Sequence, residues 1–310
     1  MDEKRYTGRQ VAIFTDAHGL YEPTKAALED MKKRGINEIY SLGDNIGVGP
    51  DPDKVIDLLV EYDVHSVAGN AEEYVRLGIE PFYSYFNAAK RLSHTWTLSK
   101  LNEKQIGVIK MMPRTIELVL GGKKIALVHF ANDVRIDFTV RSTWSYQRNF
   151  DFMGDGTRYN SNASKQFDYT NSEKQIEEIK KIIEMYGIDD PRVKGYLSVR
   201  EEPLFNGKKA SFYDAIFQGH VHWKLYDETD ATKFYSIRGV GMAYREDPVN
   251  TASYVVLKEH EEGFDMEEVL VIFDREPMIY SMLHSGSPDK TILKFTSVMD
   301  EEISNARKRI

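Results

Sequence analysis

Histidine, aspartate and asparagine residues gather in five short clusters of this sequence. The clusters are Asp16-Ala17-His18, Gly43-Asp44, Gly69-Asn70, the isolated His129, and Gly219-His220-Val221-His222. Together they offer two aspartates, one asparagine and four histidines, the oxygen and nitrogen donors that bind divalent transition metals. Such a set is sufficient for two ions that share one bridging carboxylate. The chain has no cysteine, so thiolate metal sites and cysteine nucleophiles are excluded.

The donor types also narrow the choice of metal. Imidazole nitrogen suits zinc, manganese, iron, nickel and cobalt, whereas magnesium and calcium favour sites made of oxygen alone. We therefore expect two divalent transition-metal ions, with Mn²⁺ first and Fe, Zn, Ni or Co as alternatives. An alternative interpretation is that these residues bind no metal: they would cap the ends of strands or lie hydrogen-bonded in the core. For a single isolated histidine, this alternative would be the better interpretation.

The elements that must position the clusters are short apolar strands that alternate with amphipathic helices. The predicted strands of the first half are 10–15, 38–42 and 64–68, and the predicted helices are 22–34, 53–61, 82–98 and 102–112. Each of these strands runs into one of the polar clusters. Parallel strands joined by helices end at one edge of a sheet, where ligands usually bind, so this pattern predicts that the clusters converge.

The second half of the chain is richer in strands. Gly121-Gly122 separates apolar runs at 116–120 and 124–130, which is typical of a β-hairpin. Five further short strands are predicted, at 213–218, 224–227, 233–237, 253–257 and 268–273. Residues 131–211 differ in character, with many aromatic and arginine side chains. We therefore expect a core formed by 1–130 and 212–275, an insertion or lid at 131–211, and a C-terminal extension at 276–310.

Composition limits the partners. The net charge of −8 repels phosphate polymers at long range, which argues against a protein that coats nucleic acids. Apolar runs are strand-sized, so neither a membrane span nor a secretory leader is predicted, and we expect a cytoplasmic protein. The sequence contains no indication of the oligomeric state.

The order and spacing of the five clusters resemble the signature of the calcineurin-like metallophosphoesterases. The likeness rests on D-x-H at Asp16, on GD-x-x-x-x-G from Gly43 to Gly49, and then on GN, an isolated His and GH-x-H. It is closest to the compact bacterial phosphodiesterase branch, which is similar to asymmetrical diadenosine tetraphosphate hydrolases, because the second motif continues as Gly49-Pro50-Asp51-Pro52. The resemblance implies an α/β fold, a four-layer α/β/β/α sandwich of two mixed sheets.

The resemblance also implies a role for each cluster. Asp16, His18 and His222 would bind one metal, Asn70, His129 and His220 would bind the other, and Asp44 would bridge them. A carboxylate is needed at the bridge because an anionic oxygen pair can span both ions. Asp44, Asn70 and His129 are the implied catalytic residues. The implied reaction is hydrolysis of a phosphoester by a hydroxide that bridges the two metals, with no protein nucleophile.

One position departs from the family pattern. The family usually has GNH followed by Asp or Glu, and its His is the expected general acid, but this chain reads Gly69-Asn70-Ala71-Glu72. Loss of a general acid slows the departure of basic leaving groups most. We therefore expect small phosphorylated substrates with acidic leaving groups, such as phosphodiesters or nucleotide phosphoanhydrides of the dinucleoside-polyphosphate type.

Several further residues are candidates for substrate binding. They are Asn45, Glu72, Arg135, Arg141, Arg148 and Arg158. The arginines could hold phosphate, or they could be solvated side chains around a small core of the insertion itself. Asn45 is equally well explained by turn geometry, and Glu72 by a position at a helix start or behind the metal ligands. His65, His94, His260 and His284 are expected to be structural.

Two other functions stay open at this point. The first is a phosphomonoester phosphatase that acts on proteins or small molecules. The second is a metal-bearing binding module with residual activity, because the ligand set is complete while the expected acid is missing.

Overall fold

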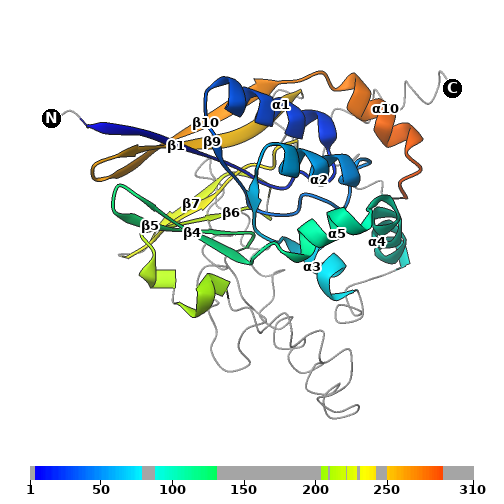
Figure 1. Cartoon of the computed structure of the whole chain (residues 1–310), viewed down its shortest axis with the longest axis horizontal. Coiled ribbons are helices and arrows are strands. Elements are labelled where there is room, and N and C mark those ends of the chain that lie inside the picture. The colour runs from blue at the N-terminus through cyan, green and yellow to red at the C-terminus, as the bar shows by residue number, and fades with distance from the viewer. Residues whose placement is uncertain are drawn as a thin grey trace, which may run out of the picture.

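Two five-stranded β-sheets lie face to face in the computed structural model, with helices packed on the outside (Figure 1). The structure describes residues 4–78, 88–130, 204–208, 210–220, 222–228, 231–241 and 250–288. Both sheets mix parallel and antiparallel strands. Among the described residues, no helix combines the length and the apolar character needed to cross a lipid bilayer.

The first sheet has the strand order β10-β9-β1-β2-β3. Its strands are β1 (Tyr6–Phe14), β2 (Glu38–Ser41), β3 (His65–Ser66), β9 (Thr251–His260) and β10 (Gly263–Ile272). The second sheet has the order β4-β5-β6-β8-β7. Its strands are β4 (Thr115–Leu120), β5 (Lys123–Val128), β6 (Ala215–Gln218), β7 (Leu225–Glu228) and β8 (Lys233–Ser236).

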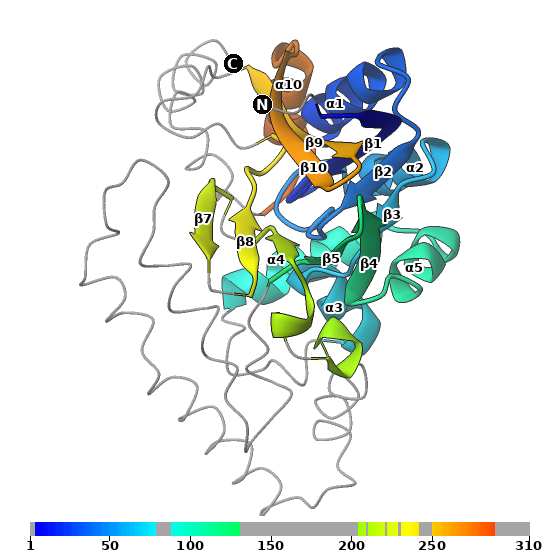
Figure 2. The ribbon, with the colours of Figure 1, turned by 90° about the vertical axis from the view of Figure 1, so that its left-hand side faces the viewer.

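The helices of the described part pack mainly on the first sheet. They are α1 (Tyr21–Lys33), α2 (Pro52–Glu61), α3 (Asn70–Leu77), α4 (Ala88–Lys100), α5 (Glu103–Lys110) and α10 (Glu276–His284). A turn at Leu204–Gly207, with left-handed backbone at Phe205 and Asn206, contacts β4 and β5 of the second sheet, and a short 3₁₀ segment follows at Ala210–Phe212. Figure 2 shows α1 and α2 on the side of the first sheet that faces away from the second sheet.

Successive side chains of the central strands pack into different layers of the sandwich. In β1, Val11 and Ile13 pack between the two sheets, while Ala12 and Phe14 pack against the helices. In β5, Ile125 and Leu127 likewise face the first sheet, while Ala126 and Val128 face a third apolar cluster outside the second sheet. Because side chains of a strand point to opposite faces in turn, strands buried on both sides read as continuous apolar runs.

The predicted α/β sandwich with two mixed sheets is confirmed, and each of the ten predicted strands is present. Helix α3 was not predicted. Residues 131–203, most of the predicted insertion, lie outside the described residues, so the domain division stays a prediction. Within the predicted C-terminal extension, α10 packs Met278 and Met282 into the same apolar cluster as α1 and α2.

The tight turn between β4 and β5 of the second sheet packs against the first sheet, at the end away from the clusters. Gly121 has φ +52°, and a Cβ atom there would overlap the carbonyl oxygen of His260 and the backbone of Gly263. The Gly121 N–H also donates to Glu259 Oε1 at 2.8 Å. The β4–β5 hairpin therefore sits against the β9–β10 hairpin in direct backbone contact, which only glycine permits.

Adjacent glycines provide a matched test of this contact. Gly122 also has a positive φ, +77°, but a Cβ atom there would meet nothing within 4 Å. We predict that Gly122→Ala lowers the free energy of unfolding by about 1 kcal/mol, the cost of the left-handed backbone alone. Gly121→Ala should cost at least about 2 kcal/mol more, because the added methyl group has no space. Urea titration of both variants measures the difference, and equal losses would contradict the contact.

Candidate metal centre

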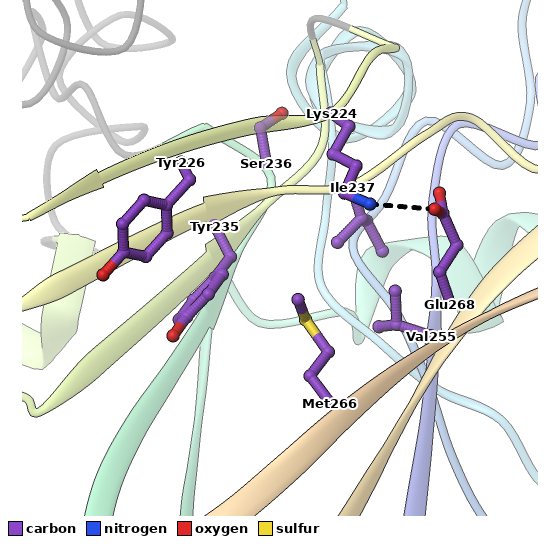
Figure 3. Close-up of a pocket in the computed structure, with 8 residues that line it drawn as sticks. All are labelled: Lys224, Tyr226, Tyr235, Ser236, Ile237, Val255, Met266 and Glu268. Carbon is purple, nitrogen blue, oxygen red and sulfur yellow. Dashed lines mark hydrogen bonds and ion pairs between the residues drawn. The ribbon is translucent and has the colours of Figure 1, made fainter. Parts of the chain in front are cut away.

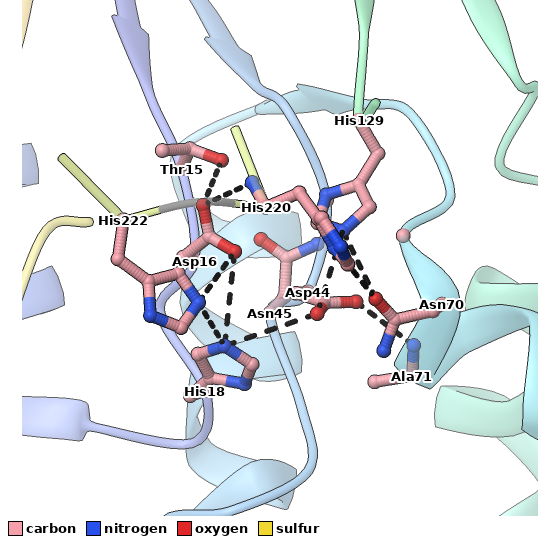
Figure 4. Close-up of polar contacts among 12 residues, drawn as sticks. Thr15, Asp16, His18, Asp44, Asn45, Asn70, Ala71, His129, His220 and His222 are labelled. Atoms are coloured by element: carbon pink, nitrogen blue, oxygen red, sulfur yellow. Dashed lines mark hydrogen bonds and ion pairs between the residues drawn. The ribbon is translucent and has the colours of Figure 1, made fainter. Parts of the chain in front are cut away.

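The predicted ligands converge at the carboxyl ends of parallel strands from both sheets (Figure 4). Asp16 follows β1 and Asp44 follows β2, both in the first sheet, while His129 follows β5 and His220 follows β6, both in the second. Asn70 is the first residue of α3. Side chains from distant parts of the sequence, such as those of Asp16 and His222, thus meet in one place.

The first group of donors consists of Asp16, His18 and His222. Asp16 Oδ1 lies 3.3 Å from His222 Nε2 and 3.7 Å from His18 Nε2, and the two imidazole nitrogens are 3.1 Å apart. Ligand atoms that are each about 2.1 Å from one ion are roughly 3.0–3.4 Å from one another. The spacing of this group is therefore close to that of a metal coordination shell.

The second group consists of Asn70, His129 and His220. His129 Nε2 lies 3.2 Å from Asn70 Oδ1 and 3.1 Å from His220 Nδ1, and the last two atoms are also 3.1 Å apart. The amide oxygen and two imidazole nitrogens thus form a compact triangle of suitable size for one ion.

Asp44 lies between the two groups. Its Oδ2 is 3.4 Å from His129 Nε2 and 3.8 Å from His18 Nε2, whereas its Oδ1 accepts the backbone N–H of Ala71 at 2.8 Å. A single oxygen, rather than the expected oxygen pair, therefore faces both groups. The reason is that the Ala71 amide already holds the other oxygen.

An unpaired buried oxygen supports a bound cation at this point. Within the described part of the chain, Asp16 Oδ1 is buried and has no hydrogen-bond partner. Leaving a buried carboxylate oxygen unpaired is costly unless an ion or water satisfies it. The other oxygen of Asp16 accepts hydrogen bonds from the Thr15 hydroxyl at 2.7 Å and from the His220 N–H at 2.9 Å. The donor set thus fits a cation that Asp16 Oδ1 would contact.

Backbone contacts also fix the ring of His129. Its Nδ1 donates to the carbonyl oxygen of Leu42 at 2.8 Å, which leaves Nε2 unprotonated in the neutral ring and directed at Asp44 and Asn70. A second hydrogen bond of this kind is the usual device by which proteins orient a histidine that binds metal.

The backbone at the site is strained. Asp16, His18, Asp44, His220 and His222 all have φ between +46° and +68°. Side-chain-bearing residues seldom adopt this left-handed region, and such outliers cluster at functional sites where the surrounding structure holds them. The strained backbone therefore indicates a functional site without reference to the chemistry of the side chains.

Two buried carboxylates dominate the electrostatics. Burial acts to raise the pKa of Asp16, but the imidazole of His222 and the other histidines bring it down to about 2. Burial opposes protonation of His129, yet the Asp44 carboxylate raises its pKa to about 10. Burial and the proximity of His129 lower the pKa of His220 to about 4. The two carboxylates are therefore ionised, and they favour a positive charge beside them, either on the His129 ring or on a bound cation.

The two described candidates for substrate contact point elsewhere. Asn45 is fully buried, with its side chain bound to Ser41 Oγ at 2.6 Å and Ser66 Oγ at 2.9 Å. Glu72 is also fully buried, and its carboxylate accepts backbone N–H groups. These contacts make both residues supports of the loops rather than surfaces for a substrate. Arg135, Arg141, Arg148 and Arg158 lie outside the described residues.

The histidines that were expected to be structural lie outside both groups. His65 lies beside Tyr40, His94 beside Tyr74, and His284 stacks on Tyr280. His260 packs edge-on against Tyr6, at the far end of β9.

A cavity of about 160 Å³ lies between the edges of the two sheets, where β7 and β8 face β9 and β10 (Figure 3). Tyr226, Tyr235 and Met266 line it, and Lys224 pairs with Glu268 at 3.0 Å beside it. None of the predicted ligands lines this cavity. It is also small compared with the roughly 300–1,000 Å³ of typical ligand pockets.

Comparison with known proteins gives an independent view of this centre. The family model described as calcineurin-like phosphoesterase superfamily domain matches residues 10–154. The uncharacterized protein MJ0912 of Methanocaldococcus jannaschii is 33% identical over 119 residues, which are 38% of this chain and 48% of that protein. The alignment thus spans about half the length of that relative.

Two crystal structures share the fold over nearly the whole chain. The metallophosphoesterase from Sphaerobacter thermophilus is 16% identical with a TM-score of 0.56, and the superposition covers 94% of this chain and 99% of that one. The hypothetical protein PH1004 from Pyrococcus horikoshii is 14% identical with a TM-score of 0.57, covering 93% and 97%. Residues 10–154 thus match the calcineurin-like phosphoesterase superfamily model, and these two structures show that the chain shares their fold.

Proposed function

We propose that this protein is a metal-dependent phosphoester hydrolase with two divalent transition-metal ions. The observation that carries the proposal is the position of Asp44 Oδ2, which lies within 3.8 Å of a ligand atom in each of the two donor groups. A dinuclear centre requires a carboxylate oxygen that is shared by two sets of nitrogen and oxygen donors. A purely structural role for Asp44 would not require its oxygen to lie near both sets.

The residues of the chain perform distinct tasks in this proposal. Two adjacent divalent cations supply the Lewis acidity that activates water and neutralises charge on a phosphoryl group. Asp16 and Asp44 provide the negative charge that holds the cations, and His129 provides a ring nitrogen of fixed orientation. His220, His222 and Asn70 are only partly buried, so a substrate would approach on their side of the centre.

Substrate class follows from Ala71. Its N–H holds Asp44, but its methyl group cannot give a proton to a leaving group. We therefore expect substrates whose leaving groups need little protonation, namely aryl or nucleotide phosphodiesters and phosphoanhydrides, with dinucleoside polyphosphates as the nucleotide-like candidate. Alkyl phosphomonoesters would react more slowly.

Metal identity and location belong to the same proposal. We propose Mn²⁺ as the preferred ion because imidazole and carboxylate donors both suit it. A cytoplasmic location is supported by the absence of cysteine, since disulfides are common in secreted domains.

Metal content provides the direct test. We predict that purified protein loaded with Mn²⁺ binds close to two equivalents and hydrolyses an aryl phosphodiester. Asp44→Asn should lose at least one equivalent and at least about 10²-fold in kcat/KM, because removing the shared charge weakens both sites. Elemental analysis and a chromogenic assay measure the two effects. Binding of one equivalent or none by the unaltered protein would refute the dinuclear centre.

Asp63→Asn is the matched control for that variant. Asp63 also has a positive φ, +52°, but it is exposed in the turn that precedes β3. The substitution therefore makes the same chemical change on the same backbone conformation, and both metal content and activity should stay at the wild-type level.

Leaving-group dependence tests the substrate class. We predict that the wild-type protein strongly prefers aryl to alkyl esters, and that Ala71→His narrows this preference by about 10- to 100-fold by supplying a proton donor. Ala71→Gln adds comparable bulk without a transferable proton and should not narrow it. The ratio of kcat/KM for the two esters is the measurement. A wild-type enzyme that turns over alkyl monoesters faster would be a phosphomonoesterase, and one that turns over neither would be a binding module.

A further inference from the structure

Two loops that carry metal ligands lie in direct backbone contact behind the centre. A Cβ atom on Gly43 would lie 2.5 Å from the Gly69 nitrogen, and one on Gly69 would overlap the nitrogen and Oδ1 of Asp44. Such approach is possible only where both positions are glycine. The loop after β2 and the start of α3 therefore form one unit.

The carboxylate of Glu72 lies at the junction of this unit. Its Oε2 accepts the N–H of Gly69 at 2.8 Å and of Asp44 at 2.9 Å, and its Oε1 accepts the N–H of Asn45 at 2.8 Å. Glu72 is fully buried, so no water competes for these bonds. Both oxygens of Glu72 thus accept backbone hydrogen bonds, which is the arrangement that suits the carboxylate form of the side chain.

These bonds hold Asp44 in an unfavourable conformation. Asp44 has φ +52°, a left-handed backbone conformation that is unfavourable for a residue other than glycine. Glu72 binds its N–H, and the N–H of Ala71 binds its Oδ1. With the main chain and one oxygen fixed, the only free atom of the carboxylate is Oδ2, the atom that faces both donor groups.

The same carboxylate also places Asn70. Glu72 is the third residue of α3, and its bond from Gly69, the residue before the helix, is half of a capping box. Because this bond fixes where the helix begins, it fixes the position of Asn70 at its first turn. Glu72 thus acts on one ligand from the first sheet and on another from the helix.

We propose that Glu72 is a positioning residue that sets Asp44 and Asn70 for metal binding without itself touching metal or substrate. Its catalytic consequence rests on the proposed function, but its effect on the two loops does not. The substitution Glu72→Gln keeps the size of the side chain and replaces one acceptor oxygen with an NH₂ group, which opposes the N–H donors of the loops.

The experiment compares full-length wild-type protein with Glu72→Gln in two ways. Amide hydrogen exchange of metal-free protein should show faster exchange at Asp44, Asn45 and Gly69 in the variant. Titration with Mn²⁺ should show affinity weakened by about 10- to 100-fold at one or both sites, the usual effect of removing a partner behind a metal ligand. The kcat should fall more than KM changes, because substrate contacts are retained.

Glu73→Gln is the matched control. Glu73 is the next residue of the same helix, is also buried, and its carboxylate pairs with Arg114 at 3.2 Å. This variant should unfold more easily, while exchange in the loops and Mn²⁺ affinity match the wild type.

The outcomes separate the two proposals. If exchange and Mn²⁺ affinity in Glu72→Gln equal those of the wild type, the positioning role is wrong even when the protein is a hydrolase. If the wild type binds no Mn²⁺ but Glu72→Gln still accelerates exchange in the loops, the proposed function fails and the positioning of Asp44 stands.

Discussion

The centre depends on how closely the loops at the ends of the two sheets approach each other. Gly219, after β6, has so little space that a Cβ atom would overlap the hydroxyl of Thr15 in the other sheet. The next residue, His220, donates its N–H to Asp16. This contact brings the second sheet's histidines to the first sheet's aspartates, and the mainly apolar layer between the sheets keeps them there.

Bringing these loops so close together is energetically unfavourable, and several local hydrogen bonds offset the cost. The left-handed backbone at five of the predicted ligand positions opposes folding, and so does the removal from water of the carboxylates of Asp16, Asp44 and Glu72. The opposing contributions are local: the Leu42 carbonyl for His129, the Thr15 hydroxyl for Asp16 and the Glu72 carboxylate for Asp44. These contacts leave Asp16 Oδ1 without a hydrogen-bond partner, and a bound cation would satisfy that oxygen.

The strands and the convergence of the seven predicted ligands could both be predicted, because each depends on a pattern that can be recognised in a single sequence. Apolar runs that end in His, Asp or Asn mark the carboxyl ends of parallel strands, and this holds for any conformation of the loops that follow. The orientation of Asn45 and Glu72 could not be predicted in the same way, because a polar residue beside a ligand can face either the site or the loop behind it. Tertiary hydrogen bonds decide between the two.

Helix α3 and the length of β10 escaped prediction for other reasons. Helix α3 has only eight residues and begins within the GN motif itself, so its apolar spacing is too short to detect. In β10, Asp265, Glu267 and Glu268 interrupt the apolar alternation, since this strand forms an edge of the sheet. Edge strands tolerate charge that a central strand would exclude.

The chain supplies its ligands in an order that matters during synthesis. Five of the seven lie between Asp16 and His129, whereas His220 and His222 follow β6, which inserts between β5 and β8. A nascent chain that has not yet emerged past β6 holds an incomplete set for either ion. In the proposed two-ion centre, tight capture of both ions would therefore occur only after the central strand of the second sheet is in place, so that metal uptake would mark the completion of folding.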